Sequence, residues 1–279
     1  MENIIPYLGE AAPYISIPEN CIFRNHKIET EISEWNFENE NYAQLIKLLF
    51  SLGSLSLYKA LNDESKEKIY FLGEKIRIRK LSYDQPKSVI IASESILESD
   101  RKGKSHIHIR DNYSKELLYS AELDYYIITR EAFELFYKDL LSTVPVEYHD
   151  KNLPESKIIN TEKPHHFTIL TEPFTPNQCK GHFENHPIVP FVFITQCILN
   201  ETFNFLGNEM SYEIESFEGY ASNALPTGII FLTEVFHQRY LKNLFISNVR
   251  SATLPEIRME WLFLLSNRKN KLSGKTASW

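Results

Sequence analysis

Two long apolar segments stand out along the chain, and a series of strand-like segments follows each of them. Residues 42–61 are apolar on nearly every face, which predicts a helix buried on all sides. Residues 190–206 have the same character and begin with a proline, which is favoured in the first turn of a helix. A helix that is apolar all round must be covered by other elements, so we expect the neighbouring segments to wrap both helices.

Alternating apolar and polar residues between turn-forming residues predict the strands that cover these helices. One strand is expected over residues 21–35, before the first helix, and another over residues 166–174, before the second. The other predicted strands are 69–81, 88–98, 104–111 and 116–128 in the first half, and 213–222, 228–237, 243–252 and 256–265 in the second. Each half therefore has one strand, one buried helix and four further strands.

The regions outside this pattern predict the domain organisation. A short helix is expected to begin after Thr129, whose hydroxyl suits an N-cap, and residues 142–163 are polar with two prolines, as in a linker. Residues 1–20 are expected to be a lead-in, with a short strand near Tyr14 to Ile17. The predicted units are a first domain over 1–141, a linker over 142–163, a second domain over 164–265 and a polar tail over 266–279.

The two halves also share letters at a constant spacing. Residues 36–39 (Asn-Phe-Glu-Asn) align with residues 182–185 (His-Phe-Glu-Asn), an offset of 146. Residues 71–73 (Phe-Leu-Gly) align with residues 217–219 (Phe-Glu-Gly) at the same offset. Two matches at one offset, together with the shared order of elements, predict an internal duplication.

Composition narrows the class of protein. The chain has 279 residues, 43% of them hydrophobic, which is enough for a full core. Its three cysteines form no CxxC pair, so neither a disulfide framework nor a zinc finger is predicted, and a cytoplasmic location is favoured. The formal net charge of -7 argues against a nucleic-acid-binding protein, and no apolar run is long enough to predict a membrane span.

One turn carries the letters of a known motif. Gly181-His182-Phe183 is followed by Pro187-Ile188-Val189-Pro190 and then by Val192. This stretch resembles the signature of the β-hydroxyacyl carrier-protein dehydratases, in which a Gly-His-Phe turn runs into the central helix. Residues 172–174 (Glu-Pro-Phe) and 224–228 (Ala-Leu-Pro-Thr-Gly) resemble flanking parts of the same family. The resemblance implies an α+β fold of two hotdogs in tandem, each a long helix wrapped by an antiparallel sheet.

The resemblance also implies roles for individual residues. His182 takes the place of the base that removes the α-proton of a 3-hydroxyacyl thioester. The family's helix carboxylate falls on Gln196, and by the repeat offset His182 should face Phe50 while Gln196 faces Asn36. We therefore expect neither composite site to join a histidine with a carboxylate. Glu201 and Glu40 are the nearest carboxylates on or near the helices.

The remaining site predictions follow from the same resemblance. The glycine that follows the second proline in the family is Phe191 here. The implied substrate-binding residues are Gly181, Phe183, Pro190, Phe191, Val192, Asn36 and Phe50. No cofactor is expected, because the acyl group would arrive on the phosphopantetheine of a carrier protein or on coenzyme A. A metal site at His182 and His186 is not expected, since further ligands at suitable spacing are missing from the sequence.

Three functions compete at this point. The first is a dehydratase or hydratase for 3-hydroxyacyl thioesters in fatty acid, polyketide or related secondary metabolism, with His182 essential and Gln196 orienting the hydroxyl. The second is a non-catalytic subunit that binds an acyl chain or assists an active hotdog partner, which the residues at the expected carboxylate positions favour. The third is an acyl transferase resembling the A-factor-type butyrolactone synthases. A homodimer or an association with another hotdog protein fits each of them.

Basic residues on the predicted strands offer one possible docking surface. Lys75, Arg77 and Arg79 share one face of a strand, and Arg239, Lys242 and Arg250 form a second group. Such residues could receive an acidic carrier protein and its phosphate. The alternative, an ordinary solvated face, is the interpretation that we favour.

Overall fold

The strands form one continuous antiparallel sheet. The computed structural model describes residues 4–267 except 26, 38, 62–66, 85, 143–145, 164, 208–211, 222, 239–243 and 252–258. The first-half elements are β1 (Ile22–Arg24), β2 (Lys27–Ile32), α1 (Tyr42–Leu61), β3 (Ile69–Lys80), β4 (Val89–Ser99), β5 (Lys102–Asp111), β6 (Leu117–Thr129) and α2 (Arg130–Phe136). The second-half elements are β7 (Ser156–Lys163), β8 (His166–Thr171), α3 (Phe191–Leu206), β9 (Tyr212–Ala221), β10 (Phe231–Gln238), β11 (Leu244–Ser251) and β12 (Met259–Asn267).

The order of the strands is the same in both halves. The whole sheet runs β1-β2-β4-β5-β6-β3-β9-β12-β11-β10-β8-β7. Read from the outside inwards, β2-β4-β5-β6-β3 in the first half matches β8-β10-β11-β12-β9 in the second. The halves join where β3 pairs with β9, with Ile76 opposite Gly219. The predicted α+β architecture of two tandem hotdogs is confirmed, and its strand order agrees with a duplication.

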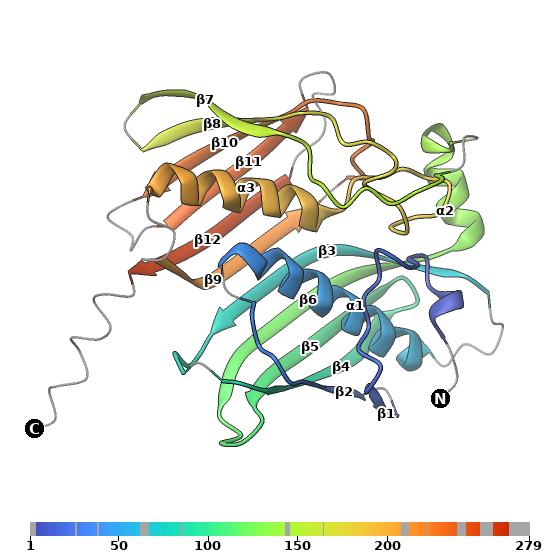
Figure 1. Cartoon of the computed structure of the whole chain (residues 1–279). Coiled ribbons are helices and arrows are strands. Elements are labelled where there is room, and N and C mark those ends of the chain that lie inside the picture. Colours follow the sequence, from blue (N-terminus) through green and yellow to red (C-terminus); the bar gives the residue numbers. More distant parts are fainter. Residues whose placement is uncertain are drawn as a thin grey trace, which may run out of the picture.

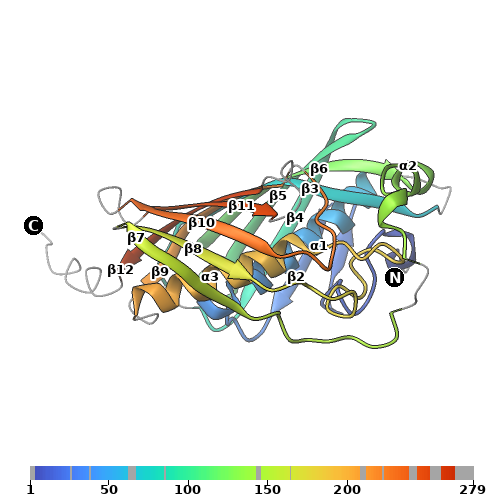
Figure 2. The same ribbon diagram turned by 90° about the horizontal axis from the view of Figure 1, so that it is seen from above.

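Both long helices lie on one face of this sheet (Figures 1 and 2). Helix α1 covers the first-half strands and packs mainly against β4 and β5, while α3 covers the second half and also contacts α1. The bounds of α1 agree with the prediction, and α3 begins one residue later than predicted, with Pro190 as its N-cap. The buried residues of both halves form one continuous core. Among the described helices, none is long and apolar enough to cross a membrane.

Local geometry repeats at the offset seen in the sequence. Asn39 and Asn185, which are 146 residues apart, both have a positive φ, of 35° and 62°. Asparagine tolerates this conformation better than most residues, and here it turns the chain before each long helix. The predicted helix cap is also confirmed, because the backbone N–H of Ala132 donates to the hydroxyl of Thr129 at 3.4 Å.

Three sequence predictions are corrected. The segment 21–35 contains two strands, β1 and β2, because Asn25 turns the chain with a φ of 55°. Residues 14–17 form no strand. The predicted linker 142–163 ends in β7, which pairs with β8 and forms one edge of the sheet.

Several other predictions fall partly or wholly outside the described residues. The first two residues of the predicted tail belong to β12, and residues 268–279 lie outside the described part of the chain. Four further residues of the sequence predictions also lie outside the described part: Glu38 in the sequence repeat, the side chain of Glu40, and Arg239 and Lys242 in the second basic group.

Candidate active site

His182 lies in a buried loop between β8 and α3. Its Nδ1 is 2.9 Å from the backbone carbonyl oxygen of Ile188. Because a carbonyl oxygen only accepts, Nδ1 must carry the hydrogen, which leaves the lone pair on Nε2. Burial lowers the pKa of His182 to about 4, against the opposing effect of this hydrogen bond. The imidazole is therefore neutral near pH 7 and can take up a proton at Nε2.

Elements of both halves hold this loop in place. The centroid of the Phe183 ring lies 5.0 Å from that of Phe133 on α2 and 5.7 Å from that of Tyr70 on β3. The rings of Phe133 and Tyr70 stack on each other, with their centroids 3.8 Å apart. After the turn, the N–H of Val189 donates to the carbonyl of Leu225 at 2.7 Å. The segment 224–228, which resembles the dehydratase family in sequence, is thus hydrogen-bonded to the loop that carries His182.

A carboxyl group faces His182, contrary to the sequence prediction. Oε1 of Glu10 is 3.8 Å from Nε2 of His182, and the two side chains are only 13% and 11% exposed. The expectation that neither site joins a histidine with a carboxylate is therefore wrong. That expectation was based on the carboxylates on or near the two long helices, whereas Glu10 belongs to the segment that precedes β1.

Two backbone hydrogen bonds fix the position of Glu10. The N–H of Gly9 donates to the carbonyl of Ile69 at 2.8 Å, and the N–H of Ala11 donates to the carbonyl of Gly181 at 2.7 Å. The first bond attaches the segment to β3, and the second attaches it to the histidine loop. The sequence did carry a signal, since Glu10 is the only charged residue between Ile4 and Ile17. A single carboxylate in an apolar stretch indicates burial at a site.

The surroundings of Glu10 favour its protonated form. Burial raises the pKa of Glu10 to about 8, and the nearby cation of Lys47 on α1 opposes this effect. The ammonium of Lys47 lies 4.8 Å from the centre of the Tyr14 ring, and that ring lies 4.7 Å from His182. Burial also lowers the pKa of Lys47. Near neutral pH the structure thus pairs a neutral imidazole with a carboxylic acid.

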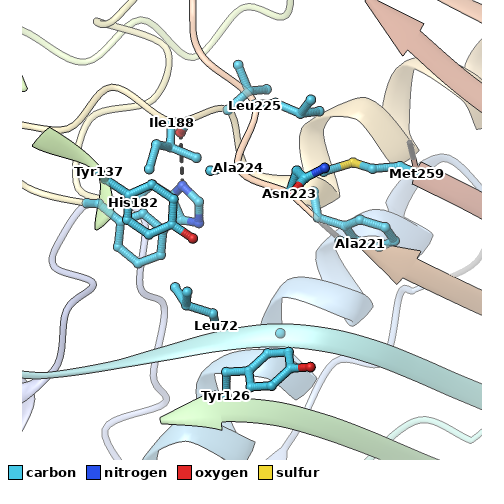
Figure 3. A pocket seen from close by; sticks show the side chains of 14 residues that line it. Leu72, Tyr126, Tyr137, His182, Ile188, Ala221, Asn223, Ala224, Leu225 and Met259 are labelled. Carbon is cyan, nitrogen blue, oxygen red and sulfur yellow. Dashed lines mark hydrogen bonds between the residues drawn. The ribbon is translucent and has the colours of Figure 1, made fainter. Parts of the chain in front are cut away.

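His182 borders a cavity of about 140 Å³ that lies where the two halves meet (Figure 3). The wall residues from the first half include Leu72, Gly73 and Tyr126. The second half contributes His182, Phe183, Ile188, Val189, Phe191, Ala221, Asn223, Ala224, Leu225 and Met259, and Tyr137 follows α2. Glu10 is beside His182 but does not line this cavity. The site is therefore composite, as the resemblance implies.

The cavity contains only part of the predicted set of site residues. Phe183 and Phe191 line it with His182, whereas Gln196 lines a separate cavity between α1 and α3 together with Lys47 and Val192. The Nε2 of Gln196 donates to Oδ1 of Asn200 at 2.6 Å. Asn36 is exposed. The ring of Phe50 contacts Tyr125 and Phe191.

Gly181 is required for the approach of the segment that carries Glu10. It has a φ of 86°, and a Cβ at this position would lie 2.5 Å from the carbonyl oxygen of Ala11. A side chain there would therefore push residues 11–14 away from the loop. Pro190, the last of the predicted binding residues, caps α3 without lining the cavity.

We expect Gly181→Ala to lower the free energy of unfolding by about 1–3 kcal/mol and to impair the site, because it adds a steric clash to backbone strain. Gly207→Ala is the matched control, since Gly207 also has a positive φ, of 69°, but has open space around the added Cβ. Urea unfolding of both variants measures the difference. Equal losses of stability in the two variants would contradict a contact between the loop and the Glu10 segment.

Two of the three residues of the first basic row are paired with acidic residues on neighbouring strands. The ammonium of Lys75 and the guanidinium of Arg77 both pair with Glu218 of β9, at 2.5 and 3.0 Å, and Arg77 also lies 3.7 Å from Glu122 of β6. This arrangement agrees with the solvated face that we favoured. Within the described part of the chain, no group of three or more His, Cys, Asp and Glu side chains is placed to hold a metal ion.

Comparisons with known proteins identify the fold. No family model matches the sequence, and no curated protein matches it. Solved structures with a similar fold include a 12:0-ACP thioesterase from Umbellularia californica, with 8% identity, a TM-score of 0.53 and coverage of 88% of this chain and 99% of that one. An acyl-ACP thioesterase from Bacteroides thetaiotaomicron has 10% identity, a TM-score of 0.53 and coverage of 87% and 98%.

An acyl-CoA thioesterase II from Mycobacterium marinum is similar to the same extent, with 8% identity, a TM-score of 0.53 and coverage of 88% and 94%. The likeness extends over nearly the whole length of each of these proteins. At this level of identity it establishes the fold alone.

Proposed function

We propose that the protein is an enzyme that adds water to, or removes it from, acyl thioesters of the 3-hydroxyacyl and 2-enoyl type. The observation that carries the proposal is the carboxyl group of Glu10 at 3.8 Å from Nε2 of His182, which itself borders a composite cavity. The raised pKa of Glu10 and the lowered pKa of His182 make the first an acid and the second a base near pH 7. Dehydration needs a base for the α-proton and an acid for the hydroxyl on the next carbon. These two reacting groups are on adjacent carbons, so the base and the acid must also be neighbours.

In the proposed reaction, Nε2 of His182 removes the α-proton and a double bond forms between the α- and β-carbons. The C–O bond at the β-carbon breaks, and the departing hydroxyl takes a proton that Glu10 supplies through a bridging water molecule, because Glu10 does not itself line the cavity. The histidine is then a cation and the glutamate an anion. The proton on Nε2 then returns to the carboxylate and restores the starting state. Because the two atoms are 3.8 Å apart, which is longer than a hydrogen bond, this transfer needs a bridging water molecule or a closer approach of the side chains.

The start of α3 supplies a place for the thioester carbonyl. The first N–H groups of a helix have no partner within it, and they form the positive end of the helix dipole. Phe191, the first residue of α3, lines the cavity. Partial negative charge that develops on the carbonyl oxygen during removal of the α-proton would be stabilised there.

Glu10 also changes the balance between the competing functions. The argument for a non-catalytic subunit was the missing carboxylate, and Glu10 now provides one next to His182. Thioester hydrolysis is the second candidate, and the names of the thioesterases with a similar fold favour it. In that reaction His182 would activate a water molecule. For both reactions we propose coenzyme A or acyl carrier protein as the carrier of the acyl group.

Product analysis separates these reactions. The purified protein is incubated with 3-hydroxybutyryl-CoA, and the products are followed by mass spectrometry while a thiol reagent detects free coenzyme A. We expect the enoyl thioester, formed by loss of one water, without release of the thiol. Release of free thiol would establish hydrolysis instead. No turnover with hydroxyacyl and enoyl thioesters on either carrier would overturn the proposal.

A further inference from the structure

Two phenylalanine rings fill the space between the long helices and the middle of the sheet. Phe50 projects from α1 and Phe191 from α3, and their ring centres are 6.4 Å apart at an interplanar angle of 72°. An edge-to-face contact of this kind is favourable for aromatic rings. The two rings thus meet at the boundary between the two halves.

A glycine on the facing strand makes room for each ring. A Cβ at Gly73 of β3 would lie 2.4 Å from Cε1 of Phe50, and a Cβ at Gly219 of β9 would lie 2.4 Å from Cζ of Phe191. The two glycines are 146 residues apart, which is the offset of the sequence repeat. Each ring therefore lies directly on the backbone of a central strand.

The ring of Phe191 is also held from its other side. It stacks on the fully buried Trp261 of β12, with centroids 5.0 Å apart and an interplanar angle of 14°. The indole N–H of Trp261 donates to the hydroxyl of Thr195 at 2.8 Å, and that hydroxyl donates to the carbonyl of Phe191 at 3.0 Å. This arrangement favours a fixed position for the ring.

The ring of Phe191 closes part of the cavity beside His182. Phe191 and Gly73 both belong to its wall, whereas Phe50 does not line the cavity but contacts both of them. The cavity holds about 140 Å³, which is small beside the roughly 300–1,000 Å³ of typical ligand pockets. A long acyl chain that entered past His182 would meet the ring of Phe191, against which the ring of Phe50 packs.

We propose that Phe50 and Phe191 form a stop that restricts the bound acyl group to a short chain. This inference rests on the proposed function, since it assumes that the cavity receives an acyl thioester. It specifies the substrate class as thioesters of short acyl groups. It also assigns to Phe191 the part of the wall where the resembling family has a glycine.

Binding of inert probes tests the stop independently of turnover. S-butyl, S-octyl and S-dodecyl thioethers of coenzyme A are titrated into the wild type and into Phe191→Ala, Phe191→Leu and Phe50→Ala by calorimetry. Phe205→Ala is the matched control, because Phe205 is also on α3 but stacks on Phe167, at 4.3 Å. Circular dichroism verifies that each variant is folded.

We expect the wild type to bind the butyl probe about tenfold or more tightly than the dodecyl probe. Phe191→Ala should reduce this ratio at least severalfold, Phe191→Leu should reduce it less, and Phe205→Ala should keep it. A wild type that binds all three probes equally, or none of them, would overturn the stop, as would an unchanged ratio in the folded phenylalanine variants. If the protein turns over acyl thioesters but binds all probe lengths equally, only the proposed stop is overturned. If it prefers the short probe but shows no turnover, only the proposed reaction is overturned.

Discussion

Replacing His182 by alanine is expected to lower kcat/KM on the hydroxyacyl thioester by about 10²–10⁴-fold, the usual contribution of a general base. Glu10→Gln keeps the shape of the side chain but removes the proton that the leaving hydroxyl needs, so a loss of similar order is expected. His108→Gln, at an exposed position on β5, is the control. Initial rates of enoyl thioester formation measure all three variants.

The double variant shows whether the two side chains act together. Residues that work as a unit have strongly non-additive effects. Because Nε2 of His182 and Oε1 of Glu10 are only 3.8 Å apart, we expect His182→Ala with Glu10→Gln to be little worse than the poorer single variant. A folded His182→Ala protein with activity close to that of the wild type would rule out His182 as the base. If the loss of activity in the double variant equals the product of the losses in the two single variants, the two side chains act independently, and a proton passed between them is ruled out.

The stability of the protein is expected to fall between pH 6.5 and pH 8. Glu10 keeps its proton up to a pKa of about 8 in the folded protein, whereas its unperturbed pKa is 4.5. The stabilisation from this proton is complete below pH 4.5 and is lost as the pH rises to about 8, because the unfolded chain binds fewer protons in this range. One pKa unit corresponds to about 1.4 kcal/mol.

His182 acts in the opposite direction at lower pH. Its pKa falls from 6.5 to about 4 in the folded protein, so the neutral form stabilises the fold above pH 6.5, and this contribution is lost as the pH falls to about 4. Between pH 4.5 and 6.5 the contributions of the two residues oppose each other. Above pH 6.5 only that of Glu10 still changes, and the expected loss by pH 8 is about 2 kcal/mol.

Urea unfolding at a series of pH values measures this loss. In Glu10→Gln the decline above pH 6.5 should be absent, because the amide does not titrate, while the rise contributed by His182 below that pH should remain. Lys47 and Tyr14 are kept in this comparison, but the variant also removes the effect of the Glu10 carboxylate on the pKa of each. Equal curves for the wild type and the variant between pH 6.5 and 8 would show that Glu10 is ionised throughout.

Much of the fold could be predicted from patterns along the chain. The apolar run at 42–61 and the proline before 191–206 locate both helices closely, because a helix covered on all sides needs apolar residues on every face. The repeat offset correctly indicated two halves with one strand order. The edge strand β7 was missed because six of its eight residues (Ser156–Lys163) are polar, as is common where one side of a strand is open to solvent.

The site was predictable only in part. His182 was predicted as a site residue from its motif, and in the structure it lines a cavity. Glu10 was not found because counting along the two helices treats each half as a closed unit, whereas the carboxyl comes from a segment outside both long helices and the main strands. Gln196 shows the same limit, since its helical position faces a different cavity from the one beside His182.

The attachment of the Glu10 segment to Gly181 has a consequence for the way the protein is made. Glu10 leaves the ribosome 172 residues before His182, because 182 minus 10 is 172. The carboxyl cannot be buried against its imidazole until those 172 further residues have been synthesised. The cavity needs residues that come later still, such as Met259 of β12. Glu10, the first group of this pair to be translated, therefore cannot reach its partner until the histidine loop has also been synthesised.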